Sequence, residues 1–225
     1  MRRPVYEIVI FGTSDFARVA RKIADDSGDF KTRAFVVDSD YLCHPELDNL
    51  PVVDSNAARL QFPSNSFPMF VAVGYKSMAN RQRLFRRWQS EGYRLVNIFA
   101  NGAIVTGDVT FGMNNIVFPG AVIEPGVELG DNNVVWSNST ICHGTLIGSH
   151  NFVAANTTTG GNVRIGDCCF IGFSSTVLQG LKVGNQVLIA AQTLVARDAE
   201  DNGEYRGIPA KRWRNIQPSE GISIR

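Results

Sequence analysis

Residues 105–135 read VTGDVTFGMNNIVFPGAVIEPGVELGDNNVV, and an apolar residue stands at every sixth position of this stretch. The same spacing continues without an insertion to Val195. Fifteen of the sixteen positions are apolar, with Thr159 the exception, against about seven expected from the 44% apolar composition. The period fits neither a helix, which repeats every 3.6 residues, nor a single strand, which repeats every two. A coil with three short sides of six residues accounts for it.

A second period of eighteen residues runs through the same region. Glycine and asparagine both recur at this interval: Gly112, Gly130, Gly148, Gly166 and Gly184, and Asn115, Asn133 and Asn151. Because a corner repeated once per coil needs backbone freedom, we expect the glycines to supply it. The asparagines predict a ladder of stacked amides. Together the two periods predict a parallel β-helix whose coils stack about 4.8 Å apart.

The first hundred residues have a different pattern, in which strands alternate with helices. Strands are expected at 6–11, 32–37, 51–53 and 69–73, helices at 16–25 and 82–91, and a connecting segment at 95–99. This alternation is typical of a parallel, Rossmann-like sheet. We therefore divide the chain into an α/β nucleotide-binding domain (1–98), an all-β helix domain (99–200) and a C-terminal segment (201–225).

Ligands of parallel sheets bind beyond the carboxyl ends of the strands. This rule selects five candidate substrate-binding residues: Gly12, Ser14, Asp38, Gly74 and Tyr75. The first loop keeps one glycine of the dinucleotide fingerprint, so Gly12 belongs either to a binding loop or only to a tight turn. Four arginines near the second helix are expected on a solvated face: Arg81, Arg83, Arg86 and Arg87.

Charge, cysteine and histidine content narrow the function classes. The 22 basic and 21 acidic residues leave no excess that would indicate a nucleic-acid partner. The apolar run at 8–11 is too short for a signal peptide or a membrane span, so we expect a cytoplasmic protein. The four cysteines show no CxxC spacing and are interpreted as reduced packing residues. Three histidines, one of them in the first domain, are too few for a three-histidine zinc site, and no metal is expected.

The domain order and several motifs resemble those of the sialic-acid O-acetyltransferases and bacterial nucleotide-amino-sugar N-acetyltransferases. The motifs lie at 10–13 (IFGT), 71–75 (VAVGY), 141–148 (ICHGTLIG), 165–167 (IGD) and 207–211 (GIPAK), and the resemblance covers nearly the whole chain. It implies a left-handed β-helix and a homotrimer with active sites between neighbouring β-helices. It also implies acyl transfer from acetyl-CoA to an amino group of a nucleotide-linked deoxysugar, such as a 4-amino-4,6-dideoxy sugar for surface glycans.

The resemblance further implies residue roles. His143 stands at the position of the general base, and the Gly161 amide at the position that receives the thioester carbonyl. The coenzyme is expected along Gly161, Gly172, Ser174, Ala191 and Lys211, and the nucleotide on the first domain. The family often has an acidic residue after the catalytic histidine, where Gly144 stands here. Another group, for example a backbone carbonyl, must then orient the imidazole.

The hexad position gives His143 support of its own. His143 follows the inward-facing Ile141 by two residues, so its side chain is expected to point outward, and Gly161 stacks on it eighteen residues later. A base beside a backbone N–H suits direct attack of an amine on a thioester. An acyl-enzyme on Cys142 is the weaker alternative.

Several features leave alternatives open. Trp136 is expected to point outward, toward either a subunit contact or a sugar pocket. His150, near a coil corner, fits a structural role better than substrate binding. Four basic residues either meet the coenzyme phosphates or form a solvated tail: Arg206, Lys211, Arg212 and Arg214. Two other functions stand beside N-acetyl transfer, namely O-acylation of a sugar hydroxyl and nucleotide-sugar binding without catalysis.

Overall fold

The computed structural model describes residues 5–74 and 76–224. The chain forms two compact units, one comprising residues 1–74 and 83–101 and the other 75–82 and 102–225. Each unit contains its own sheet structure and buried apolar residues. Within the described residues no helix is long and apolar enough to cross a membrane.

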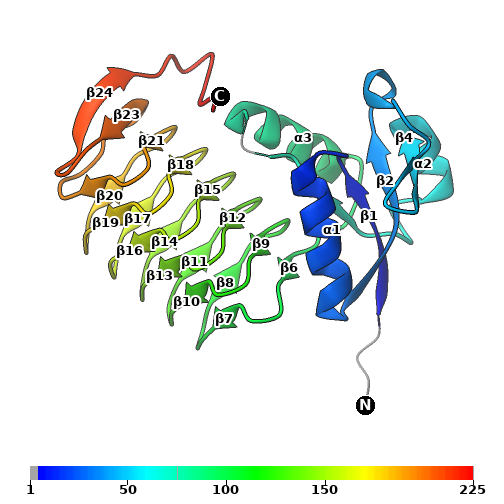
Figure 1. Ribbon diagram of the computed structural model, residues 1–225, viewed down its shortest axis with the longest axis horizontal. Coiled ribbons are helices and arrows are strands. Elements are labelled where there is room, and N and C mark those ends of the chain that lie inside the picture. Colours follow the sequence, from blue (N-terminus) through cyan, green and yellow to red (C-terminus); the bar gives the residue numbers. More distant parts are fainter. Residues whose placement is uncertain (1–4, 75, 225) are drawn as a thin grey trace. The chain divides into compact units, whose positions relative to one another are not determined.

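The first unit is an α/β domain around a five-stranded sheet (Figure 1). The strand order is β3-β4-β2-β1-β5, and neighbouring strands are parallel except in the β3–β4 hairpin. Its elements in chain order are β1 (Tyr6–Phe11), α1 (Asp15–Ser27), β2 (Phe30–Val37), the 3-10 helix η1 (Ser39–Tyr41), β3 (Glu46–Leu47), β4 (Leu50–Asp54), α2 (Ser55–Gln61), β5 (Met69–Val71), α3 (Met78–Ser90), whose first turn belongs to the second unit, and β6 (Ile98–Phe99). The predicted Rossmann-like class is confirmed.

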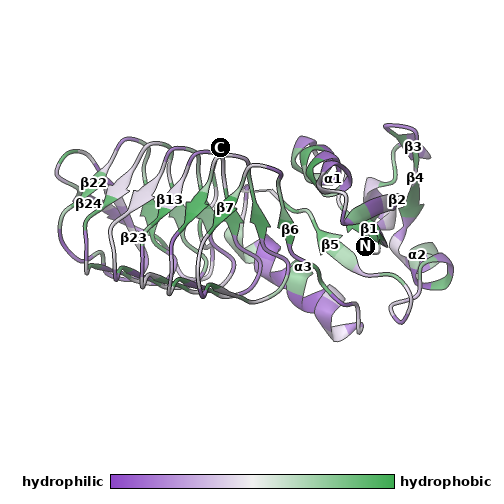
Figure 2. Cartoon of the chain, turned by 90° about the horizontal axis from the view of Figure 1, so that it is seen from below, coloured by the Kyte–Doolittle hydropathy of each residue, from purple (hydrophilic) through white to green (hydrophobic). Residues whose placement is uncertain are grey.

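Burial patterns explain why these segments form a strand and a helix. Residues 8–11 of β1 are almost completely buried, as expected for an interior strand of a parallel sheet. In α1 the buried residues recur at helical spacing (Phe16, Ala17, Ala20 and Ala24), and Figure 2 shows hydrophobic and hydrophilic residues alternating along this helix. Gly28 ends α1 with a left-handed φ of 78°, and its N–H donates to the Asp25 carbonyl.

The second unit is a left-handed parallel β-helix of two-residue strands (Figure 1). Side 1 consists of β7 (Ile104–Val105), β10 (Val122–Ile123), β13 (Thr140–Ile141), β16 (Thr158–Thr159), β19 (Thr176–Val177) and β22 (Leu194–Val195). Side 2 consists of β8 (Thr110–Phe111), β11 (Glu128–Leu129), β14 (Leu146–Ile147), β17 (Arg164–Ile165) and β20 (Lys182–Val183). Side 3 consists of β9 (Ile116–Val117), β12 (Val134–Val135), β15 (Phe152–Val153), β18 (Phe170–Ile171) and β21 (Leu188–Ile189). The antiparallel pair β23 (Gly203–Arg206) and β24 (Lys211–Asn215) extends side 3.

The glycine column exists, but the reason we expected for it is wrong. None of the five glycines has a left-handed φ. A Cβ atom on Gly130 would instead lie 2.9 Å from the carbonyl oxygen of Gly148 in the next coil, so close coil-to-coil approach excludes a side chain there. The left-handed positions of this corner come two residues after each glycine and are held by Asn114, Asn132, His150, Cys168 and Gln186.

The asparagine ladder is confirmed. Asn115 Oδ1 accepts the Asn133 backbone N–H at 2.8 Å, and Asn133 Oδ1 accepts that of Asn151 at 2.9 Å. Each of the first two side chains also donates from Nδ2 to a glycine carbonyl of the next coil, Gly130 and Gly148 respectively, at 2.9 Å. Because these amides are buried, the ladder satisfies polar groups that water cannot reach.

Arg81 corrects another expectation. Although we expected it on a solvated helix face, its side chain is only 1% exposed, and Nη2 donates to the Asn132 carbonyl at 2.6 Å. Burial lowers the pKa of Arg81 to about 10. His150 is also buried, with Nδ1 3.0 Å from the Asn132 side-chain nitrogen. These contacts fasten the first turn of α3 to the β-helix, and they agree with a structural role for His150.

Candidate active site

His143 lies at the corner between sides 1 and 2, two residues after the last inward-facing residue of β13. That residue, Ile141, is fully buried, whereas the His143 side chain is 60% exposed. The imidazole therefore projects from the coil, as its hexad position predicts, and is accessible to a substrate.

A carboxylate from the preceding coil holds His143. Because Ile123 of β10 pairs with Ile141 of β13, Glu124 is carried to the same corner. Its Oε2 accepts the His143 backbone N–H at 2.8 Å and lies 3.2 Å from Nδ1 of the ring. The sequence interpretation missed this residue, although Glu124 stands eighteen positions before Cys142 and so next to His143 in the coil register.

Gly161 lies against the same imidazole. A Cβ atom on Gly161 would overlap Nε2 of His143 and would lie only 2.6 Å from Cε1, so the ring occupies space that any side chain would fill. The two coils are joined by the Asn162 N–H, which donates to the His143 carbonyl at 2.8 Å. For the Gly161 N–H we find no acceptor among residues 5–74 and 76–224. The imidazole of His143 and the amide of Gly161 are thus neighbours, with no side chain between them.

Cys142 is half-buried beside this pair. Burial raises the pKa of its thiol, and the negative charge of Glu124 together with a hydrogen bond to that carboxylate raises it further. Since the thiolate is the nucleophilic form of cysteine, a thiol held in the protonated state is a poor nucleophile. The arrangement therefore disfavours an acyl-enzyme on Cys142.

Other predicted residues lie at a different corner. Trp136, Gly172, Ser174 and Ala191 are all at the corner between sides 3 and 1, so one chain does not bring them together with His143. Trp136 is half-buried and stacks on Phe118, with ring centroids 3.9 Å apart and planes 17° apart. Eighteen and thirty-six residues after Trp136 come the small residues Ala154 and Gly172. Both of these small residues are buried.

Most of the basic residues predicted to meet the coenzyme form ion pairs with nearby glutamates. Arg206 and Arg214 both pair with the buried carboxylate of Glu204, and Arg212 pairs with Glu200 at 2.8 Å. Lys211 is exposed at the start of β24, and within the described part of the chain no ion pair involves it. Of the four cations, Lys211 is therefore the one available to an external anion.

The turn that follows β1 in the first unit leaves little space for side chains. Gly12 follows β1 with a φ of 121°, and a Cβ there would lie 2.6 Å from the Ala72 carbonyl oxygen, so the position requires glycine. Ser14 is exposed as the N-cap residue of α1, and its side chain makes no capping hydrogen bond. Gly74 is half-buried near Phe16. Tyr75, the remaining predicted residue, lies outside the described residues.

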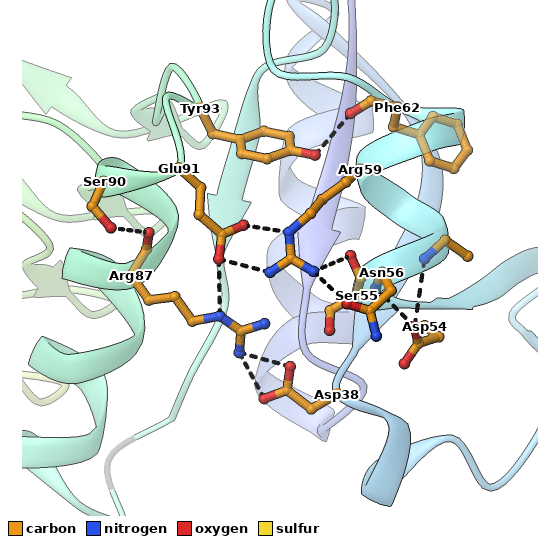
Figure 3. A network of polar contacts seen from close by, with 11 residues as sticks. Asp38, Asp54, Ser55, Asn56, Arg59, Phe62, Arg87, Ser90, Glu91 and Tyr93 are labelled. Carbon is orange, nitrogen blue, oxygen red and sulfur yellow. Dashed lines mark hydrogen bonds and ion pairs between the residues drawn. The ribbon is translucent and has the colours of Figure 1, made fainter.

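Asp38, directly after β2, belongs to a network of ion pairs (Figure 3). Both of its carboxylate oxygens accept from Nη1 of Arg87, at 2.7 and 2.9 Å. Arg87 also donates to Glu91, which Arg59 binds at 2.7 and 2.9 Å. Burial acts to raise the pKa of Glu91, but the hydrogen bonds from the two arginines outweigh it and hold the pKa below its ordinary value. Arg87 thus holds the carboxylate of Asp38 in a fixed orientation, and both of its oxygens already accept a hydrogen bond from this arginine.

No group of three or more possible metal ligands gathers anywhere in residues 5–74 and 76–224. The polar groups at the His143 corner are the exposed imidazole, the carboxylate of Glu124 and the amide of Gly161.

Comparisons with known proteins agree with both units. Residues 7–88 match the family model described as the PglD N-terminal domain, and residues 108–143 match the model described as bacterial transferase hexapeptide (six repeats). No curated protein sequence matches the chain.

Solved structures resemble nearly the whole chain. PerB from Caulobacter crescentus, in complex with CoA and GDP-perosamine, is 26% identical with a TM-score of 0.83, and the match covers 92% of this chain and 96% of that one. The acetyltransferase domain of PglB from Neisseria gonorrhoeae, in complex with acetyl coenzyme A, is 22% identical with a TM-score of 0.84, and the match covers 93% and 100%. Both similarities extend over the α/β unit and the β-helix together.

Proposed function

Since the chain belongs to the hexapeptide-repeat acetyltransferases that carry a PglD-type N-terminal domain, we propose that it acetylates the amino group of a nucleotide-linked amino-deoxysugar. The donor is acetyl-CoA, and the acceptor is a 4-amino-4,6-dideoxy sugar on a nucleoside diphosphate. PerB, the relative at 26% identity, binds CoA and a GDP-linked amino sugar, which supports this choice of donor and acceptor class.

The observation that carries the proposal is the outward imidazole of His143, held by Glu124 and packed against Gly161. The acceptor nitrogen attacks the thioester carbonyl carbon while Nε2 of His143 takes a proton from it as general base. The Gly161 N–H donates to the carbonyl oxygen as negative charge develops there. The C–N bond forms, the C–S bond breaks and coenzyme A leaves as the thiol, so no covalent intermediate on the protein is needed.

The remaining predicted residues bind the two substrates. The coenzyme lies along Gly161, Gly172, Ser174 and Ala191, and its phosphates meet the exposed Lys211. The nucleotide lies at the strand ends of the first unit, near Gly12, Ser14, Asp38 and Gly74, and Trp136 forms a wall of the sugar pocket. Glycine and backbone groups at these positions allow close approach of phosphates.

The assembly is a homotrimer formed through the β-helix. Support comes from the uninterrupted coil array and from the location of Gly172, Ser174 and Ala191 at a different corner of the chain from His143. The reaction takes place in the cytoplasm, without nucleic acid or membrane as a partner, and supplies surface glycans such as lipopolysaccharide O-antigen. Sedimentation that shows a stable monomer at micromolar concentration would contradict the trimer.

The test is a thiol-release assay with acetyl-CoA and a panel of amino-sugar nucleotides linked to UDP, dTDP or GDP. Each amino sugar is paired with its analogue that has a hydroxyl in place of the amine. Faster thiol release with the amino sugar is the expected result. Faster release with the hydroxyl analogues would identify an O-acyltransferase, and binding of the nucleotides without turnover would identify a binding protein.

A further inference from the structure

The corner at His143 leaves no room for an acid in the position where the sequence resemblance expects one. Gly144 follows His143 with a φ of +65°, a left-handed conformation that disfavours side chains. A Cβ atom on Gly144 would also lie 2.5 Å from Oδ1 of Asn162 in the next coil. An acidic residue at 144 would therefore strain the backbone and collide with the neighbouring coil.

Glu124 approaches the same imidazole from the opposite direction along the stack. Its carboxylate receives two hydrogen bonds, from the His143 backbone N–H at 2.8 Å and from the ring at Nδ1 at 3.2 Å. The backbone and ring contacts with His143 keep the pKa of Glu124 below its ordinary value. A carboxylate that stays ionised is a hydrogen-bond acceptor only, so Nδ1 must carry the proton in this contact.

We propose that Glu124 is the positioning residue of the acyl transfer, and that it holds neutral His143 in the tautomer with the proton on Nδ1. The kinetic part of this inference rests on the function proposed above. In that tautomer the lone pair belongs to Nε2, the ring nitrogen against Gly161. In this chain, Glu124 of the preceding coil thus takes the place of an acidic residue directly after His143.

Two consequences for the reaction follow. Nε2 accepts the proton of the attacking amine, and the imidazolium so formed lies beside a carboxylate, which stabilises the positive charge. The imidazolium then returns its proton to the departing thiolate, so the base is regenerated and coenzyme A leaves as the thiol.

The tautomer can be measured without any substrate. The chain has three histidines, so long-range proton–nitrogen NMR spectra of ¹⁵N-histidine-labelled protein contain few signals, and loss of a signal in His143→Asn assigns His143. We expect protonated Nδ1 and unprotonated Nε2 at a pH where the ring is neutral. A wild-type protein with the proton on Nε2 would overturn the proposal, whatever the variants do.

Kinetics test the consequence for catalysis. Loss of the carboxylate that orients a catalytic histidine can lower kcat by up to about 10⁴-fold, so Glu124→Gln should lower kcat at least about tenfold while both KM values stay within about twofold. Glu128→Gln is the matched control, because Glu128 is an exposed glutamate on β11. Its kcat should equal that of the wild type. A Glu124→Gln enzyme with wild-type kcat and an unchanged His143 tautomer would show that Glu124 is only structural.

The two hypotheses fail in different ways. If no amino-sugar nucleotide supports thiol release but the NMR spectrum has the Nδ1–H tautomer, the proposed function is wrong and the positioning contact stands. If the wild-type enzyme turns over and Glu124→Gln changes neither kcat nor tautomer, the positioning role is wrong and the function stands.

Discussion

The two candidate sites each contain a carboxylate with a basic partner, and they use it differently. At the coil corner, Glu124 holds an imidazole that remains 60% exposed. At the end of β2, Asp38 is held by Arg87, which is 26% exposed and also bonded to Glu91. The corner therefore presents an exposed imidazole to the outside, whereas the strand end presents a carboxylate that is fixed by the protein's own cation.

The difference comes from how each pair is brought together. Glu124 and His143 meet because the eighteen-residue register places them at one corner of adjacent coils. Asp38 and Arg87 are 49 residues apart and meet through the packing of α3 within the first unit. In a repeat, the spacing in the sequence therefore determines which residues are neighbours in space. In an α/β domain, tertiary packing determines it.

The largest effect is expected from His143→Asn. Removing a positioned general base typically lowers the rate by about 10²–10⁴-fold, and we expect a loss of kcat in that range in the thiol-release assay. The fold and both KM values should change little, because the side chain is mostly exposed. If the variant retains more than about a tenth of the wild-type kcat at pH 7, His143 positions substrate and is not the base.

Gly161→Ala tests whether the space beside the ring matters. The added methyl group overlaps the imidazole of His143, and a displacement of about 1 Å can lower kcat about 10²-fold. Gly180→Asn is the control, because Gly180 also lies at the corner between sides 1 and 2, has an open surrounding and a φ of +72°, and corresponds to Asn162 one coil earlier. Equal kcat values for the two variants would remove Gly161 from the mechanism.

The sequence predicts the β-helix more completely than the site on it. The periods of six and eighteen residues identify the coils from Val105 to Val195, because a repeated backbone conformation requires a repeated residue type. They miss the last turn, where Glu204 pairs with Leu188 sixteen residues earlier. The eighteen-residue period also predicts that Glu124 lies beside Cys142 and His143, because Glu124 stands eighteen positions before Cys142. An acid was expected next to His143 in the sequence, where Gly144 leaves no room for a side chain.

The first unit has no repeat from which spatial neighbours could be predicted. Its strands and helices follow from apolar patterning, and its loops follow from the strand-end rule. The ion pairs of Asp38 and the burial of Arg81 depend on where α3 packs, and no spacing in the sequence contains that information. The glycine column shows a related limit, since periodicity reveals that a side chain is excluded but does not distinguish a strained φ from a close neighbour.

Asp38→Asn tests whether the strand end binds a ligand or only braces the fold. If Asp38 contacts the nucleotide, losing a hydrogen bond to its charge, worth roughly 1.5 kcal/mol, should raise KM for the sugar nucleotide about tenfold with kcat unchanged. Asp48→Asn is the control, because Asp48 is another arginine-paired carboxylate of the same unit, 2.8 Å from Arg18. Each variant loses one ion pair with an arginine, so a general loss of stability does not distinguish them. Equal KM values of the two variants for the sugar nucleotide would show that Asp38 has only a structural role.

The smallest effect concerns the reactivity of Cys142. Its pKa is raised first by burial and then by the charge and hydrogen bond of Glu124, so below that pKa only a minor fraction is thiolate and alkylation is slow. Glu124→Gln removes the two contributions of the carboxylate and leaves burial, so the pKa falls and the alkylation rate at a fixed pH should rise several-fold.

The experiment uses iodoacetamide and peptide mass spectrometry in a Cys43→Ser background, because Cys43 is exposed. Cys168 and Cys169 are buried, and burial raises the pKa of Cys169 to about 12, so neither should compete. In the wild type the rate should rise about tenfold per pH unit below the Cys142 pKa, since only the thiolate reacts. Glu128→Gln should leave this profile unchanged. Superimposable profiles for Glu124→Gln and wild type would mean that the carboxylate does not act on the thiol, and the two contacts of Glu124 with His143 alone would then distinguish the corner from the strand end.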